Sequence, residues 1–293
     1  MKLNHLIPAS LLLVMMPFVS CGDDNEGDSP SNDNNDINKD KAQPDNNEMF
    51  DNHEYVDLDL PSGILWSTMN VGATKPEECG DYFAWGETAP KEEYNIYTYK
   101  WIVHIFNDRL PNKSIDSLFV LTKYTGQLED LYNHNIENQS YFSTVYGGET
   151  DRYTDYIMAD KFDNLFTLLP ENDAATVNWG KMWRTPTDDE WKELIDNCRC
   201  TRTELNGIGG FRIRGKNGNS IFLPDAYYKN DKEINYNASC EGGNIGPGWY
   251  WSSSLYFSDL REAFFLGFGK NGHIEDGYVN ERWKGLSIRP VRK

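Results

Sequence analysis

The stretch Trp183-Arg184-Thr185-Pro186-Thr187-Asp188-Asp189-Glu190-Trp191 predicts where the clearest helix of this chain begins. Thr187 and Glu190 stand three residues apart and predict a capping box, and the acidic first turn favours the positive end of a helix. Apolar residues then recur at the spacing of one helix face: Trp191, Leu194, Ile195 and Cys198. We therefore expect an amphipathic helix over 187–198 that packs against a core.

The chain after this helix has the pattern of antiparallel strands. Gly215-Lys216-Asn217-Gly218 and Gly269-Lys270-Asn271-Gly272 both contain an Asn-Gly step, which tolerates the positive φ of a hairpin turn. They predict a hairpin of 211–214 with 220–223 and another of 263–268 with 273–278. Strands are also expected at 249–254 and 286–291, and the last would tie the C-terminus into a sheet.

Short strands are also expected before the helix. Residues 55–60 alternate apolar and acidic side chains, as a half-buried strand does, and 64–71 and 81–86 follow as further strands. Residues 95–170 are polar and weakly periodic, so we expect loops and short helices there, with an insertion near 127–168. These patterns predict one α+β domain over 54–293.

The first 20 residues have the form of a secretory signal, with Lys2 before a short apolar run over 6–19. Ser20-Cys21 at the end of this run resembles the lipobox of bacterial lipoproteins, which implies cleavage before Cys21 and acylation of that cysteine. An ordinary signal peptide with a chance cysteine is the alternative. We predict a signal peptide over 1–20 and an outer-membrane lipid anchor at Cys21.

Residues 21–53 have the composition of a disordered, acidic tether. Ten acidic residues and two lysines lie between 22 and 53, with few apolar residues to offset chain entropy. Gly22-Asp23-Asp24 resembles the acidic surface-export signal of Bacteroidetes lipoproteins, which implies that the domain faces the cell exterior. A solubilising spacer is the alternative.

The charge of the whole chain limits its partners. Acidic residues outnumber basic ones 46 to 28, a formal net charge of −18. A nucleic acid is therefore not an expected partner, because phosphate binding needs clustered Lys and Arg. The only long apolar run is the N-terminal one, which excludes a multi-spanning membrane protein.

Four cysteines follow Cys21, namely Cys79, Cys198, Cys200 and Cys240. An exported protein permits disulfides, and the sequence leaves all three pairings open. No second close pair follows Cys198 and Cys200, so a zinc site is not expected. No cofactor is predicted.

Many short motifs in order resemble the Fibrobacter succinogenes major paralogous domain, which is abundant in surface lipoproteins of Bacteroidetes. Those nearer the N-terminus are Tyr55-Val56-Asp57-Leu58, Asn70-Val71-Gly72-Ala73, Gly80-Asp81-Tyr82-Phe83-Ala84-Trp85-Gly86-Glu87 and Leu121-Thr122-Lys123-Tyr124. Those nearer the C-terminus are Asp173-Ala174-Ala175, Trp183 to Trp191, Ile221-Phe222-Leu223-Pro224, Tyr250-Trp251-Ser252-Ser253-Ser254 and Ser287-Ile288-Arg289-Pro290-Val291. The resemblance covers nearly all of 54–293.

The resemblance implies a C-type-lectin-like fold of mostly antiparallel short strands with one or two amphipathic helices. Proteins of this architecture include adhesins and lectin-like binders. We expect the motifs themselves to be scaffold, with Trp183, Trp191 and Trp251 in one aromatic core and Arg184 satisfying buried backbone groups. Glu190 belongs to the same scaffold through its capping box.

Patterns of catalysis are missing from the sequence. His104, His134 and His273 are not at metal-ligand spacing, and neither His-Glu-x-x-His nor Gly-x-Ser-x-Gly occurs. Activity like that of the formylglycine-generating enzyme group, which shares the Arg-x-Pro-Thr-x-x-Glu-Trp string, needs two close late cysteines, and only Cys240 follows Cys200. A glycosidase needs a carboxylate pair that sequence does not identify. We expect no enzyme.

Two late stretches mix aromatic, charged and polar residues as recognition loops do. The candidate ligand-binding residues are Tyr256, Asp259, Lys270, His273, Glu275, Tyr278, Arg282 and Trp283, of which Trp283 fits the core equally well. We expect an adhesin-like protein that binds an extracellular glycan or protein. A structural or fimbria-associated assembly subunit is the alternative. Arg212 and Arg214 are expected on a solvated strand face.

Overall fold

The computed structural model describes residues 48–106, 117–126, 143–145, 155–159, 162–236 and 246–293. The predicted signal peptide, Cys21, residues 21–47 of the tether, Cys240 and most of the predicted insertion lie outside these residues. Within them, no helix has the length and apolar character needed to cross a membrane.

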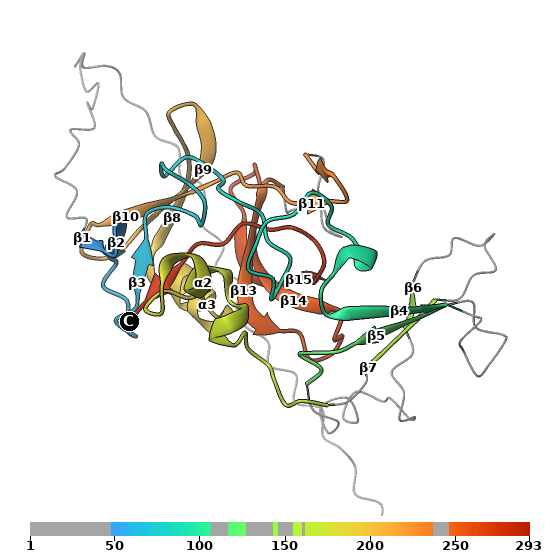
Figure 1. The fold of residues 1–293 in the computed structure, drawn as a ribbon. Coiled ribbons are helices and arrows are strands. Elements are labelled where there is room, and N and C mark those ends of the chain that lie inside the picture. The colour runs from blue at the N-terminus through green and yellow to red at the C-terminus, as the bar shows by residue number, and fades with distance from the viewer. Residues whose placement is uncertain (1–47, 107–116, 127–142, 146–154, 160–161, 237–245) are drawn as a thin grey trace, which may run out of the picture. The chain divides into compact units, whose positions relative to one another are not determined.

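Short, mostly antiparallel strands make up small sheets, with few helices among them (Figure 1). This confirms the coarse α+β prediction. The predicted helix is also confirmed: α3 spans Asp188–Asn197, and Thr187 and Glu190 form the capping box. Its buried residues are Trp191 and Leu194. A shorter helix, α2 (Ala174–Trp179), is capped by Asp173, and 3-10 turns lie at Ile96–Thr98 and Pro170–Asn172.

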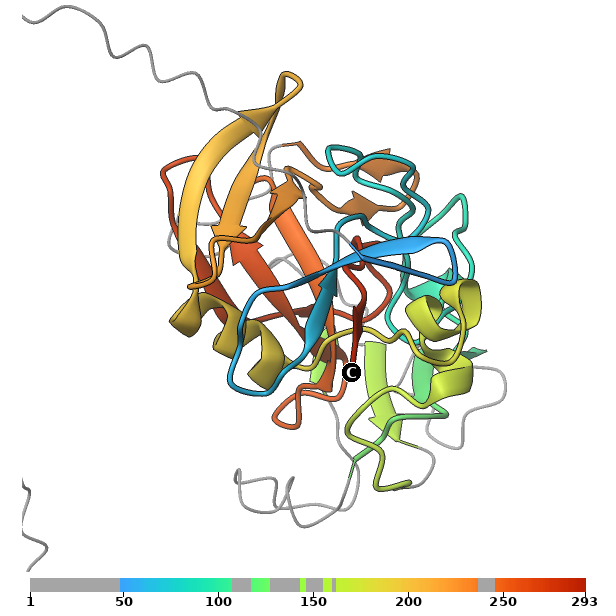
Figure 2. The ribbon, with the colours of Figure 1, turned by 90° about the vertical axis from the view of Figure 1, so that its left-hand side faces the viewer.

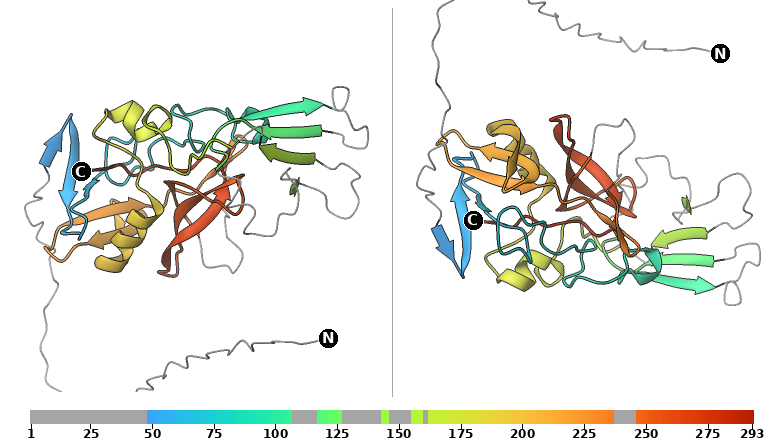
Figure 3. Two further views of the ribbon diagram at one scale, coloured as in Figure 1. Left: turned by 90° about the horizontal axis from the view of Figure 1, so that it is seen from below. Right: turned by 90° about the horizontal axis from the view of Figure 1, so that it is seen from above.

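The first sheet joins both ends of the described chain. Its strands are β1 (Glu48–Phe50), β2 (His53–Asp57), β3 (Leu65–Ser67) and β16 (Val291–Arg292), in that order. Val291 pairs with Trp66, so the C-terminus is tied into a sheet as expected, beside the blue N-terminal strands (Figure 3). The predicted tether boundary is wrong here, because β1 already pairs with β2 at Glu48.

Several predicted strands are shorter than expected. The strand predicted over 64–71 is only β3, and 81–86 and 286–290 contribute isolated bridges, among them Phe83 with Leu286. The tight turns around these segments interrupt regular pairing: Val71 and Asp81 hydrogen-bond across Gly72 and Gly80, which both have positive φ.

Both predicted Asn-Gly hairpins are confirmed. The first joins β9 (Ile208–Arg214) to β10 (Ser220–Pro224), and the preceding strand β8 (Arg199–Leu205), which the sequence patterns do not reveal, forms the free edge of that sheet. The second joins β14 (Glu262–Phe268) to β15 (Ile274–Glu281) beside β13 (Gly248–Leu255). A two-stranded ribbon of β11 (Lys229–Asn230) and β12 (Glu233–Ile234) lies between them in sequence.

Residues 95–170 contain a sheet that was predicted as loops and short helices. Its order is β4 (Ile102–Phe106), β5 (Ser117–Leu121), β7 (Asp155–Ala159) and β6 (Ser143–Val145), with β5 and β7 parallel. The prediction fails because the strands lie among polar segments whose composition hides their short apolar runs. Phe119 and Leu121 bury β5 against the aromatic core.

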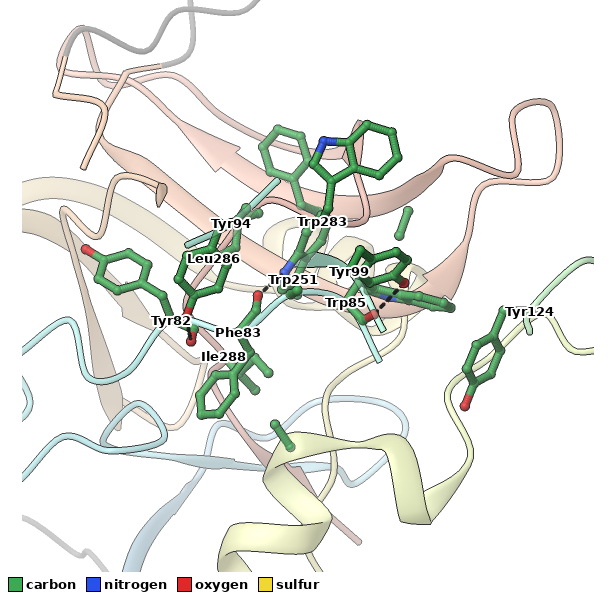
Figure 4. Packing of buried hydrophobic residues seen from close by; sticks show 14 of the residues in the cluster. Tyr82, Phe83, Trp85, Tyr94, Tyr99, Tyr124, Trp251, Trp283, Leu286 and Ile288 are labelled. Atoms are coloured by element: carbon green, nitrogen blue, oxygen red, sulfur yellow. Dashed lines mark hydrogen bonds between the residues drawn. The ribbon is translucent and has the colours of Figure 1, made fainter. Parts of the chain in front are cut away.

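The core consists of two clusters rather than one. Trp183 and Trp251 belong to the larger, which gathers rings from the segment 82–99, β13 and residues 283–288 (Figure 4). Trp191 belongs to the smaller, between α3 and the first strands, where its ring lies 4.7 Å from that of Trp66. The expectation of a single aromatic core is thus corrected.

A fully buried arginine holds the segments around both clusters together. The Arg289 guanidinium donates to Asn70 Oδ1 (2.8 Å) and to the carbonyls of Ser67 (3.1 Å), Thr68 (2.9 Å) and Phe222 (2.9 Å). No carboxylate of the described residues pairs with it, and burial lowers its pKa to about 10. One cation therefore satisfies carbonyl groups that would otherwise be buried without partners.

Replacing Arg289 by Lys tests this role. An ammonium group cannot make the planar fork of bonds to both the 67–70 segment and Phe222, so we expect the free energy of unfolding to fall by about 3 kcal/mol. Urea unfolding followed by tryptophan fluorescence measures it. The exposed Arg214→Lys is the control and is expected to change stability by less than about 0.5 kcal/mol. A loss of similar size in both variants would contradict the role.

Candidate functional site

The β14–β15 hairpin separates the predicted binding residues into two groups. Lys270, His273 and Glu275 lie at or near its turn, whereas Tyr256 and Asp259 lie in the β13–β14 loop, at the end where Glu262 pairs with Glu281. Strands of this length place the two ends about 20 Å apart. The predicted set is therefore not one continuous surface.

Three of the predicted residues meet at β15 and the residue just before it, and we call His273, Glu275 and Tyr278 the outer-strand site. His273 Nε2 lies 2.9 Å from Glu275 Oε2 and 3.2 Å from the Tyr278 hydroxyl. That hydroxyl donates to the same Glu275 oxygen at 2.9 Å. Side-chain exposure is 36% for His273 and 54% for Glu275, so the cluster is open to solvent.

A bulge in β15 places these three side chains on one face. Between the pairs Phe265–Tyr278 and Gly267–Glu275, residues 276 and 277 together oppose Leu266. Gly277 has a φ of +76° and supplies the bend. In a regular strand Glu275 and Tyr278, three positions apart, would project to opposite faces, because side chains alternate along a strand.

A row of rings supports the site from below. Tyr278 stacks on Phe265 with centroids 5.7 Å apart, Phe265 on Trp249 at 4.6 Å, and Trp249 contacts Tyr228 at 4.7 Å. Phe265 and Trp249 are buried. The polar end of Tyr278 is thus held by a rigid aromatic support rather than by a mobile loop.

The opposite end of the hairpin carries an ion pair and a carboxyl group with a raised pKa. The Arg261 guanidinium donates to both oxygens of the Asp259 carboxylate. Asp259 was predicted to bind a ligand, but its carboxylate is already paired with Arg261. Burial, with the Asp259 and Glu281 carboxylates, raises the pKa of Glu262 to about 7. Tyr256 packs edge-on against Phe264 at 5.3 Å. Arg261 and Glu262 were not among the predicted site residues, although their charges stand close to Asp259 in the sequence.

Arg282 is wrong as a ligand-binding residue, because it is fully buried. Its guanidinium donates to the Tyr99 hydroxyl at 2.9 Å and to the carbonyls of Lys123 (2.9 Å), Tyr124 (3.1 Å) and Leu260 (2.8 Å). It also lies over the ring of Trp85, 5.0 Å from the centroid. Arg282 therefore joins segments inside the core, as Arg289 does.

For Trp283, which was predicted to fit a binding surface and the core equally well, the structure favours the core. Its exposed fraction is 2%, and its ring meets that of Tyr99 edge-on at 6.4 Å (Figure 4). Lys270, by contrast, is exposed in the turn between the two strands.

The predicted scaffold residues lie in or beside the core. Arg184 forms a fork with Glu190 at 2.5 and 2.7 Å, so a carboxylate rather than the backbone is its main partner. Glu190 also accepts from Thr187 N at 2.9 Å, which links this ion pair to the helix cap. Indole groups bond to strand carbonyls: Trp191 to Trp251 (3.3 Å) and Trp251 to Phe83 (2.8 Å).

The described cysteines are free thiols: Cys79, Cys198 and Cys200. Burial raises the pKa of both Cys198 and Cys200 to about 11, so neither is an activated nucleophile. Among the described residues, no group of three or more His, Cys, Asp or Glu side chains is arranged to hold a metal ion.

Comparison of the chain with protein-family profiles, curated proteins and solved structures finds no match in any of the three.

Glu262 predicts how stability varies with pH. Because its pKa is raised in the folded protein, its contribution is favourable at low pH and is lost as pH rises from about 4.5 through 7. Since the group is partly exposed, we expect Glu262→Gln to be about 1 kcal/mol more stable than the natural chain at pH 8 and equal to it at pH 4. Thermal unfolding at both pH values measures this.

The exposed Glu233→Gln on β12 is the matched control and is expected to show no such pH-dependent gain. If Glu262→Gln and the natural chain differ in thermal stability by the same amount at pH 4 and at pH 8, the pKa of Glu262 is not raised in the folded protein.

Proposed function

We propose that this protein is a surface-anchored lipoprotein that binds an extracellular glycan or protein non-covalently through the outer-strand site. We further propose that it belongs to the Fibrobacter succinogenes major paralogous family and has a C-type-lectin-like fold. The observation that carries the binding function is the hydrogen-bonded, solvent-open cluster of His273, Glu275 and Tyr278 on its aromatic support.

The chemistry of this cluster suits hydroxyl-rich ligands. Glu275 is an acceptor, the Tyr278 hydroxyl is both donor and acceptor, and the imidazole of His273 offers one of each when neutral. Sugar hydroxyls also donate and accept, and they can replace the bonds that the three side chains make with one another. Because the ring of Tyr278 is fixed by Phe265, little side-chain entropy is lost on binding.

The family proposal is supported by contacts between the motifs that carry the resemblance. Arg289 of the last motif bonds to Asn70 of the second, and Asp173 accepts two bonds of 2.8 Å from the backbone N–H and hydroxyl of Thr185. Motifs that serve a common fold should meet in this way.

An assembly subunit is the second candidate, and the edge strand β8 favours it. β8 has seven residues and pairs only with β9 among the described strands. An added strand from another chain could pair along this edge. In that case the outer-strand site would have no ligand of its own.

A glycan and host-protein array with the full chain in detergent, run with calcium and with chelator, tests the binding function. We expect a specific ligand whose affinity falls about tenfold in Glu275→Gln and in Tyr278→Phe, because each change removes a hydrogen bond of about 1.4 kcal/mol. Glu233→Gln and Tyr97→Phe change exposed residues of the same types and are the controls.

If the chain binds a ligand and both site variants bind it with unchanged affinity, the outer-strand site is not the binding site. If the folded natural chain binds nothing on the array and cross-links to neighbouring copies or pilus-like partners on cells, the assembly function is correct instead.

The lipid anchor has a separate test at Cys21. Cys21→Ser removes the only thiol in the predicted lipobox, so we expect loss of metabolic labelling by fatty acid and release from the membrane fraction. Cys79→Ser, which changes a thiol within the folded domain, should keep both properties. Membrane retention of unlabelled Cys21→Ser would contradict the anchor.

A further inference from the structure

We propose that the outer face of the β8–β9 hairpin binds carboxylated or sulfated glycans, on a different sheet from the outer-strand site. In the strand register, Arg199 of β8 lies directly opposite Arg214 of β9, and Thr201 lies opposite Arg212. Residues opposite one another on antiparallel strands share a face. Arg199, Arg212 and Arg214 therefore form one cluster, which we call the arginine face.

The arginine face is the side of the β8–β9 hairpin that points away from the smaller core cluster; Phe222 of β10, opposite Arg212, shares this face but is buried. Phe211 and Ile213, which alternate with the two arginines of β9, are buried in the smaller core cluster. Arg199 and Arg214 are exposed, and Arg212 is half-buried. Figure 2 shows the hairpin extending from the margin of the described fold, above α3. Lys216, also exposed, adds a fourth cation in the turn that follows β9.

The three guanidinium groups have no partner of the kinds that hold the other described arginines. Arg184, Arg202 and Arg261 each pair with a carboxylate, Arg282 and Arg289 are buried against carbonyl oxygens, and Arg292 lies over aromatic rings. No carboxylate of the described residues lies within ion-pair distance of the arginine face. In a chain with a net charge of −18, a cluster of unpaired cations is unexpected.

Fold stability does not account for this arrangement. Like charges directly opposite on two strands are destabilising, as Arg199 and Arg214 are here. Charges on an edge strand can protect it from aggregation, which would explain Arg199 on β8. That reason does not apply to Arg212 and Arg214, because β9 is the central strand of its sheet. A ligand that neutralises the charges would explain all three.

The surroundings favour an acidic glycan over a protein. Guanidinium groups bind carboxylate and sulfate oxygens in a bidentate manner. The only large hydrophobic residue exposed on β8 or β9 is Ile208, next to the hairpin turn, so the face lacks the apolar and aromatic centre of a protein interface. A nucleic acid would make too few phosphate contacts here to overcome the net charge of the chain. To bind an acidic polysaccharide, a surface needs only a local cluster of cations with polar neighbours.

Binding of defined glycans at several salt concentrations tests the proposal. The full chain in detergent is titrated with heparin (sulfated), polygalacturonate (carboxylated) and dextran (neutral). We expect binding to one or both acidic glycans, no binding to dextran, and an affinity that falls steeply as salt rises. Binding to neither acidic glycan at low salt, or equal binding to dextran, would overturn the proposal.

The double variant Arg212→Gln/Arg214→Gln locates the site. We expect at least a tenfold loss of affinity for the acidic glycan and a salt slope lower by about two, one for each lost contact. The melting temperature should not fall, because a like-charge pair is removed. Lys181→Gln/Lys232→Gln changes the net charge equally at exposed positions and should keep the affinity within about twofold.

Glu275→Gln separates this surface from the outer-strand site. It should leave acidic-glycan binding unchanged, so a failure of the outer-strand proposal would not affect the arginine face. An equal loss in the lysine control, or a loss in Glu275→Gln with none in the arginine variant, would overturn the inference.

Discussion

The fold depends on buried guanidinium groups that bond to backbone carbonyls. Arg289 joins the turn after β3, the β10 strand and the C-terminal segment, and Arg282 joins the β13–β14 loop to residues 123–124 and Tyr99. The first sheet is small and the chain between β3 and β4 contains no named strand, so many carbonyl groups there have no strand partner. Two arginines with five donors each can satisfy several such groups at once.

The two proposed binding surfaces lie on strands outside this arginine-held interior. The bulge at Gly277 then brings His273, Glu275 and Tyr278 to one face, while the register of β8 with β9 brings three arginines to another. Strand register and the β15 bulge create both surfaces, whichever fold family the chain belongs to.

Local signals predicted the parts of the structure that local chemistry determines. The capping box of α3 and the two Asn-Gly hairpins are confirmed because turn and cap residues act within a few positions. Arg282 was wrong as a binding residue because its burial depends on Tyr99, Lys123 and Leu260, which are distant in sequence. The outer-strand site was predicted residue by residue, but its shared face depends on a bulge that the sequence marks only with a glycine. Strands β4 to β7 were missed because long-range pairing, not local pattern, selects them.

Buried arginines should make the interior more rigid than the outer strands. Native-state amide hydrogen exchange of the full chain measures this difference. We expect the slowest exchange at residues 64–71 and 286–291 around Arg289, with faster exchange in β8 and at the outer edge of β15. Early exchange of the Arg289 segments, at or before the rate of β8, would contradict it.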